Sequence, residues 1–149
     1  MVGHIVLYNM KAKHYINSIK VAIAQDATAL ITSTDAGVAV HSEKVKWYEL
    51  ALSGLASLTI EQDTADGVKT KTAKLAAALC HNETLSPRCI FLLHTTSGEE
   101  FLLGTPLRPY AIWSILPTFA ANTSEASGLT LSATLTAAVP LLKYIRRKI

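Results

Sequence analysis

Apolar and polar residues alternate along residues 54–79, on both sides of an Asp66-Gly67 dipeptide. Asp-Gly between two alternating runs is the strongest short-range signal of a β-hairpin with a two-residue turn. Counting outward from this turn sets apolar residues opposite one another: Ala65 and Val68, Ile60 and Ala73, Leu58 and Leu75, and Ala56 and Ala77. The polar side pairs Thr59 with Lys74, Glu61 with Thr72, and Asp63 with Thr70. Because a slip of one residue would move the apolar set to the solvent face, the pattern predicts this one register.

The outer third of this hairpin, residues 61–71, carries charged residues and almost no apolar ones. A tip of this composition does not belong in the chain's own core, so we predict that it projects into water or against a polar partner. A solvated tip is the simpler interpretation. The alternative is an arm that reaches a neighbouring subunit, with these residues as the proposed contacts: Glu61, Asp63, Lys69 and Lys71.

A second hairpin is predicted over residues 90–105, with Ser97-Gly98 as its turn. This turn sets His94 opposite Phe101, Leu93 opposite Leu102, and Leu92 opposite Leu103. One face then holds Ile90, Leu92, Phe101 and Leu103, and the other holds Phe91, Leu93 and Leu102. A strand pair that is apolar on both faces is covered on both faces. It is therefore either the middle layer of a sandwich, or a surface buried by another copy, with Phe91, Leu93 and Leu102 as proposed subunit contacts.

The rest of the chain reads as short strands separated by turn residues. These strands are expected at residues 4–10, 15–24, 28–34, 38–41, 45–52, 111–116 and 129–137. Pro117 and Pro140 are expected to end the strands before them, and residues 142–149 to form a basic C-terminal tail. The pattern predicts one all-β, mainly antiparallel domain over residues 1–149, a β-sandwich or barrel-like fold with a long projecting hairpin.

Alanine is frequent in residues 16–30 and 72–78, and alanine favours helices. A helix in either segment is therefore an alternative to the predicted strand. At most one short helix is expected.

Composition narrows the classes of partner. Hydrophobic residues make up 50% of the chain and charged residues 17%, which is typical of a packed core rather than of disorder. The net charge of +3 is too mild and too evenly spread to predict specific nucleic-acid binding. The first ten residues lack the pattern of a signal peptide, and no apolar run reaches the roughly 20 residues that span a bilayer. We expect a soluble protein made in a cytoplasm, with no membrane partner.

Two cysteines, Cys80 and Cys89, flank a short connection. Paired strands on either side would bring them within disulfide reach, whereas a chain without an export signal favours reduced thiols; the sequence does not decide between these states. With His81 they supply three potential metal ligands, but no second pair in zinc spacing accompanies them. We therefore expect no metal site and no cofactor.

Motifs for catalysis are lacking. The five histidines are scattered, and the chain has no G-x-S-x-G, no G-x-G-x-x-G and no phosphate-binding loop. We therefore expect no enzyme; Asp26, Asp35 and His41 are the only candidates for a site built from loops. A binding module for a small ligand or carbohydrate is the alternative, with Trp47, Tyr110 and Trp113 as contact residues, although core packing explains both tryptophans more simply.

Residues 52–62 read Leu-Ser-Gly-Leu-Ala-Ser-Leu-Thr-Ile-Glu-Gln and lead into residues 66–72, Asp-Gly-Val-Lys-Thr-Lys-Thr. Residues 101–105, Phe-Leu-Leu-Gly-Thr, lead into residues 108–110, Arg-Pro-Tyr. This middle part of the chain resembles small β-rich proteins encoded among the tail and neck genes of tailed bacteriophages and prophages. The resemblance includes no catalytic signature and carries over no functional residue. It implies a structural subunit of a virion, made in the bacterial host cytoplasm, that assembles in a ring or tube with copies of itself and with other virion proteins.

Overall fold

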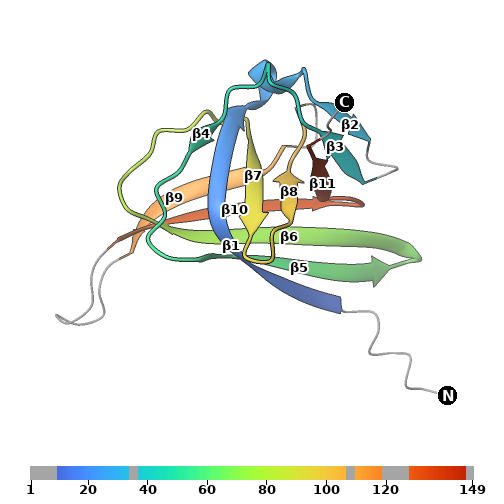
Figure 1. Ribbon diagram of the computed structural model, residues 1–149. Coiled ribbons are helices and arrows are strands. Elements are labelled where there is room, and N and C mark those ends of the chain that lie inside the picture. The colour runs from blue at the N-terminus through green and yellow to red at the C-terminus, as the bar shows by residue number, and fades with distance from the viewer. Residues whose placement is uncertain (1–9, 34–36, 107–109, 119–127, 147–149) are drawn as a thin grey trace.

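The computed structural model describes residues 10–33, 37–106, 110–118 and 128–146, and almost all of its regular structure is β-strand (Figure 1). The strands are β1 (Met10–Ile23), β2 (Ile31–Ser33), β3 (Val38–Val40), β4 (Tyr48–Glu49), β5 (Ala56–Ala65), β6 (Val68–Leu79), β7 (Cys89–Thr95), β8 (Glu100–Leu103), β9 (Ile112–Thr118), β10 (Gly128–Ala137) and β11 (Leu141–Ile145). A single 3-10 turn, η2 (Ala24–Ala27), follows β1 in the described part of the chain. The predicted all-β class is confirmed.

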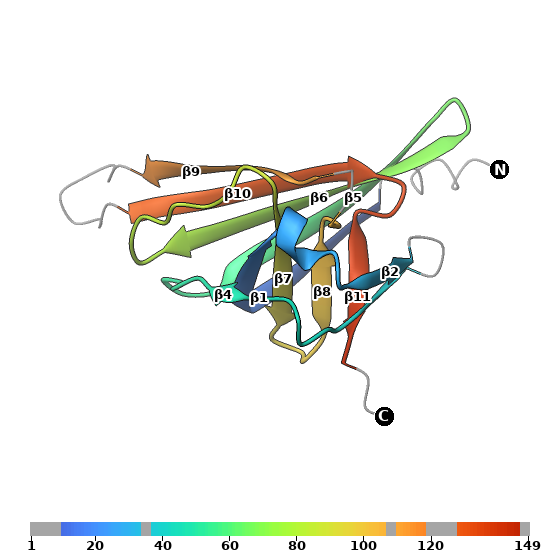
Figure 2. The ribbon, with the colours of Figure 1, turned by 90° about the horizontal axis from the view of Figure 1, so that it is seen from above.

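All 11 strands belong to one open mixed sheet, in the order β2-β3-β11-β8-β7-β1-β5-β6-β10-β9, with β4 beside β1. Among the described strands, only β11 and β3 pair in parallel. The sheet folds over on itself, so that β5, β6, β10 and β9 form one layer and β7, β8, β11, β3 and β2 form the other (Figures 1 and 2). The result is a β-sandwich-like fold with a projecting hairpin.

Strand β1 connects the two layers. Its first half, to Ile16, pairs with β5 on one edge, and its second half, from Ser18, pairs mainly with β7 on the other edge. The register shifts between these two residues, which leaves Asn17 as an extra residue in the ladder. A bulge of this kind bends a strand and increases its twist. This bend carries β1 from one layer into the other.

The main core lies between the layers. It collects alternate residues of β5, β6 and β10 on one side and of β1, β7 and β8 on the other; its largest fully buried members include Ile16, Ile19, Leu58, Leu75, Phe91, Leu93, Leu103 and Leu131. Full burial of one such side chain contributes roughly 1.5–3 kcal/mol. This core therefore holds the two layers together.

A second core lies on the opposite face of β7 and β8. Ile90, Leu92 and Leu102 pack there against η2 and the segment that follows it, together with Leu142 and Tyr144 of β11. The strand pair is thus the middle layer of three, as one of the two sequence interpretations predicted. The chain itself covers both faces.

The central hairpin has the predicted register. Strands β5 and β6 pair from Ser57 with Ala76 to Ala65 with Val68, including Leu58 with Leu75. Asp66 and Gly67 have φ values of 51° and 77°, the left-handed pair that a tight turn of type I′ requires. The segment 72–78 belongs to β6, so the helix considered there is not formed.

The second hairpin differs from its predicted register by one residue. Leu93 pairs with Phe101, Leu92 with Leu102, and Phe91 with Leu103, while His94 faces Glu100 rather than Phe101. Three residues rather than two form the loop, because the backbone N–H of Thr95 already bonds the carbonyl of Glu99. Gly98 has a φ of 95° at the loop's last position, where a three-residue loop places a left-handed residue. The predicted partition of the two apolar faces was therefore wrong.

The predicted basic tail is wrong for residues 142–145. Residues 141–145 form β11, which lies between β8 and β3 and buries Leu142 and Tyr144. Apolar residues alternate there with Lys143, a period of two that the neighbouring basic residues obscured. Residues 147–149 lie outside the described part of the chain.

Other boundaries moved less. The 16–30 segment is a strand to Ile23 and then the 3-10 turn η2, so it contains no α-helix. Strand β9 continues through Pro117 instead of ending there, since a strand at the edge of a sheet tolerates the missing N–H of proline. Of the predicted 45–52 strand, Tyr48 and Glu49 form β4, and Leu52 makes an isolated bridge to Leu79. The predicted 4–10 strand lies outside the described residues apart from Met10.

The loop of the second hairpin gives a test of its left-handed backbone at Gly98. Gly98→Ala should lower the free energy of unfolding by about 1 kcal/mol, because an alanine strains the left-handed backbone that sets the loop. Urea unfolding measures the change. Gly128→Ala is the matched control, since Gly128 has no left-handed φ and open space around its Cα. Equal stability of the two variants would contradict this left-handed backbone.

Candidate functional site

The outer part of the central hairpin, the two-stranded ribbon of residues 63–70, pairs with no third strand among the described residues. Within the described part of the chain, β1 pairs with β5 as far as Gln62, and β10 pairs with β6 as far as Lys71. Beyond these positions the two hairpin strands pair with each other, and the tip extends past the rest of the sheet (Figure 2). The projection predicted from the sequence is present.

The four charged residues proposed as contacts divide between the two faces of the hairpin. Asp63 and Lys69 lie on the ribbon, and Glu61 and Lys71 lie at its base, where Glu61 pairs with Lys11 of β1 and Lys71 with Ala137 of β10. Glu61 faces Thr72 and Asp63 faces Thr70, so both carboxylates lie on the face that continues the outer side of the sheet. Lys69 faces Thr64 and Lys71 faces Gln62, so both ammonium groups lie on the other face. Asp63, Lys69 and Lys71 are exposed, and Glu61 is half-buried. The ribbon therefore carries opposite charge on its two faces.

The other three proposed contacts do not lie on the surface. Phe91 and Leu93 are fully buried in the core between the layers, and Leu102 is fully buried in the second core. The chain's own β5–β6 and η2 segments cover the two faces that these residues occupy. They are core residues, and no face of this hairpin is left for a neighbouring subunit to cover.

Large apolar side chains are instead exposed at the two ends of the sheet. Ile112 and Leu116 of β9 are 79% and 63% exposed, and Ile31 of β2 is 70% exposed. Strands β2 and β9 are the first and last strands in the order of the sheet, so each has an edge with no neighbour among the described strands. Sequence analysis missed this feature, because edge position depends on the strand order and not on local pattern.

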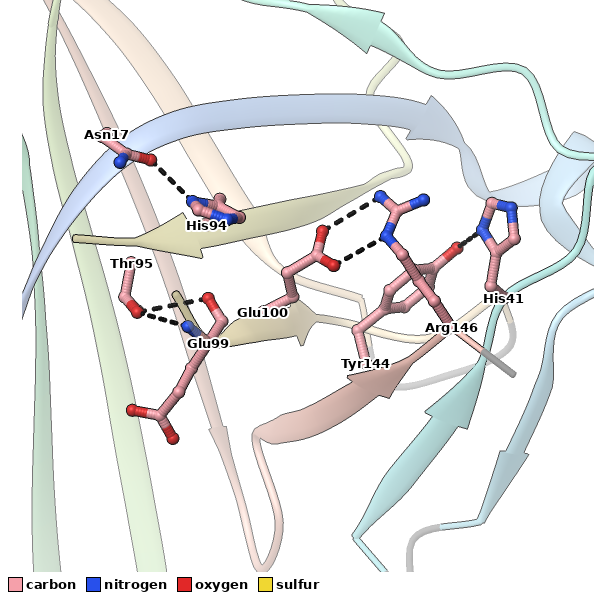
Figure 3. A network of polar contacts seen from close by, with 8 residues as sticks. All are labelled: Asn17, His41, His94, Thr95, Glu99, Glu100, Tyr144 and Arg146. Carbon is pink, nitrogen blue, oxygen red and sulfur yellow. Dashed lines mark hydrogen bonds and ion pairs between the residues drawn. The ribbon is translucent and has the colours of Figure 1, made fainter. Parts of the chain in front are cut away.

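A network of polar contacts lies below the second core, across β1, β7, β8 and the end of β11 (Figure 3). Arg146 donates two hydrogen bonds to Glu100, from Nε to Oε1 at 2.7 Å and from an Nη to Oε2 at 3.0 Å. These bonds hold the pKa of Glu100 below its usual value, although burial acts in the opposite direction. The same pair raises the pKa of Arg146. The ion pair fastens the end of β11 to the beginning of β8.

His94 occupies the middle of this network, between Ser18 and Glu100 in cross-strand register. Its Nδ1 lies 2.9 Å from Oδ1 of Asn17, the bulged residue of β1. An amide oxygen only accepts hydrogen bonds, so Nδ1 of His94 donates to it. A depression of about 400 Å³ lies over this part of the sheet. Its lining includes Ser18, His94, Glu100 and Arg146, together with Lys20 and Glu49.

The network resembles a catalytic arrangement only in its residue types. The carboxylate that would orient a base is engaged by Arg146, and an uncharged amide holds the histidine. Beside this network, Nδ1 of His41 forms a hydrogen bond with the hydroxyl of Tyr144 in β11 (Figure 3). Burial raises the pKa of Tyr144. All of these contacts join strands far apart in the sequence, which supports a role in holding the sheet.

Two adjoining pockets lie at the end of β1, on either side of Ile23 and Ser86. The first, about 490 Å³, is lined by Lys44, Lys46, Asp26 and Tyr48 over an apolar floor. The second, about 450 Å³, contains Tyr110, whose ring lies under the Arg88 guanidinium. The loop between them is held by the Trp113 indole N–H, which donates to the Ser86 carbonyl. A hydrogen bond to Glu83 raises the pKa of Tyr48 on the rim.

The candidates for chemistry do not converge. Asp26 lines the first pocket, His41 bonds Tyr144, and Asp35 lies outside the described residues. Of the three aromatic residues proposed for a ligand, Tyr110 lines the second pocket. Trp113 packs against the main core, and Trp47 packs edge-on against Tyr144 in the second core.

Comparison with known proteins adds no relative: no protein-family model, curated protein or solved structure matches the chain. Within the described residues, no group of three potential ligands is placed to hold a metal ion. Nor is any described helix long and apolar enough to cross a membrane.

The ion pair between Glu100 and Arg146 predicts a pH-dependent stability. Glu100→Gln should lower the free energy of unfolding by about 1 kcal/mol at pH 7. Because the pKa of folded Glu100 is depressed, this contribution is present above the pKa of an unfolded glutamate, about 4.3, and is lost as pH falls through the folded-state pKa. Urea unfolding at pH 7 and near pH 2.5 measures both values. Glu99→Gln, an exposed neighbour, is the control, and an equal loss in both variants would contradict the assignment.

The two thiols should differ in reactivity. Burial raises the pKa of Cys89 to about 11, whereas Cys80 is exposed. Since the thiolate is the reactive species, Ellman's reagent at pH 8 should titrate one thiol in the folded protein and both after unfolding. Cys80→Ser should remove the fast reaction. Fast reaction of both thiols in the folded protein would show that the core over Cys89 opens readily.

Proposed function

We propose that the protein is a non-catalytic structural subunit of a phage or phage-like virion, in the tail or neck region. It assembles through sheet and hairpin contacts with copies of itself, in a ring or tube, and with other virion proteins. The proposal joins the resemblance of residues 52–110 to the distribution of exposed groups on the molecule.

One observation carries the proposal. The largest exposed aliphatic side chains, Ile112 and Ile31, lie on the two edge strands of the sheet, and Val68 is exposed at the hairpin tip. Natural sheets usually protect their edges with charge, bulges or covering segments. Exposed apolar residues at both edges and at the projecting tip are what a subunit extended by neighbours requires.

The charges of the hairpin give such contacts a direction. Glu61 and Asp63 lie on one face, and Lys69 and Lys71 lie on the other. A surface that is acidic on one side and basic on the other matches unlike surfaces of successive neighbours, which favours repeated head-to-tail contacts. Their contribution falls as salt is raised.

The competing function is a binding module for a small ligand or carbohydrate. It receives less support, because Trp47 and Trp113 serve the two cores and the polar network joins strands. The pockets beside Ile23 carry one aromatic residue each, Tyr48 and Tyr110.

The ribbon provides the test. Phage particles produced with the triple variant Asp63→Ala, Lys69→Ala, Lys71→Ala should contain at least tenfold less of the protein than those with the wild type. The loss follows because a neighbour-facing charge pattern is removed without touching the core. Density-gradient purification and immunoblotting of the particle fraction measure the protein.

The matched control removes one acid and two lysines elsewhere, as Glu43→Ala, Lys44→Ala, Lys46→Ala in the exposed segment before β4. Both variants are first checked for wild-type thermal unfolding. Equal incorporation of the two variants would contradict a contact at the ribbon. Absence of the wild-type protein from purified particles would contradict the virion function itself.

A further inference from the structure

Strand β9 forms one edge of the sheet that the described residues build. It is the last strand of the order and pairs with β10 over residues 112–118, while its other edge faces no described strand (Figure 2). No charged residue occurs between Tyr110 and Thr118. Of the residue types that usually protect an edge strand from pairing, such as lysine and proline, this stretch has Pro117, near its end. We propose that β9 pairs antiparallel with β9 of a second copy, about a two-fold axis at Ser114.

The backbone of β9 is suited to this pairing. Proline has no N–H, and in sheets it is placed where that group would face away from the neighbouring strand. Because successive residues of a strand direct their backbone groups to alternate sides, the position of Pro117 assigns Trp113 and Ile115 to the open edge. Their N–H and C=O groups are the ones that a second strand would bind.

The side chains select the register. With the axis at Ser114, Ile112 faces Leu116 of the second copy on the outer face, and Trp113 faces Ile115 of the second copy on the inner face. An axis at Ile115 would set Ile112 against Thr118 and Leu116 against Ser114. An axis at Trp113 would set Ile112 against Ser114. Only the first register matches apolar with apolar residues on both faces, as cross-strand pairs prefer.

A second copy fits this edge better than the other edge of the same protein. Strand β2 is only 3 residues long, so a contact between β9 and β2 would leave much of β9 unpaired. Two copies of β9 have equal length, and the absence of charge avoids the repulsion between like charges in a symmetric contact. This inference deepens the proposed function by naming one contact of the assembly, but the pair would form in solution whether or not the protein enters a virion.

Cysteine cross-linking tests the register. In the proposed pair, the two Ser114 residues face each other at a non-hydrogen-bonded position, where side chains of antiparallel strands come closest. Ser114→Cys, in a Cys80→Ser background, should form a covalent dimer under mild oxidation at least tenfold faster than Ser132→Cys. Ser132 is the matched control because it is also exposed and lies opposite Ser114 on the interior strand β10. Equal rates, or no dimer from either variant, would overturn the proposal.

Analytical ultracentrifugation supplies an independent measurement. Ile112→Lys, Leu116→Lys should weaken dimerisation at least tenfold, whereas Leu55→Lys, which changes a leucine about as exposed as Leu116, should leave it unchanged. Loss of association on Ile31→Lys alone would overturn the proposal in favour of a β9–β2 contact. A protein that enters particles but gives no Ser114 cross-link retains the proposed function and refutes the pair, and the reverse result refutes only the function.

Discussion

The pairing of one bent strand with two partners determines this fold. Strand β1 bonds β5 with its first half and mainly β7 with its second, and the change falls at the bulge of Asn17. Without that bend the layers would lie side by side, and the apolar faces of β5 and β6 would have nothing to cover them. The two cores, the projecting ribbon and both open edges follow from the folded sheet. The bulge also brings the Asn17 amide to His94, so the feature that bends the strand also places a polar contact.

Local sequence pattern predicted the parts of the structure that local chemistry decides. The Asp66-Gly67 turn fixes the central hairpin, because both residues adopt left-handed backbone and only a two-residue turn satisfies that demand. Ser97-Gly98 is ambiguous, since the glycine serves equally as the last residue of a three-residue loop. The hydrogen bonds of Thr95, which no pattern reveals, decided between them. The strand 141–145 was hidden because a run of basic residues is also typical of a solvated tail.

The candidate site depended more on tertiary structure. The polarity of the hairpin tip follows from composition, so its exposure was predictable, and the register then divides its charges between two faces. Whether this chain or another copy covers Phe91 and Leu93 was not predictable, because an apolar strand pair can be covered equally well by either. Ile112 illustrates the converse: its apolar side chain suggests a core residue, and only the strand order places it at an edge. The ion pair of Arg146 with Glu100 joins positions 46 residues apart, beyond the reach of any spacing rule.

The placement of β11 also has a consequence for the order in which the molecule forms. Strands β2 and β3 reach the rest of the sheet only through β11, although they precede it by about a hundred residues of chain. During synthesis they cannot join the rest of the sheet until residues 141–145 have emerged from the ribosome. A chain that stopped near residue 140 would lack β11 and would leave residues 31–40 unpaired with the rest of the sheet. The emergence of β11 and the closure of the second core are thus coupled, because Leu142 and Tyr144 complete that core.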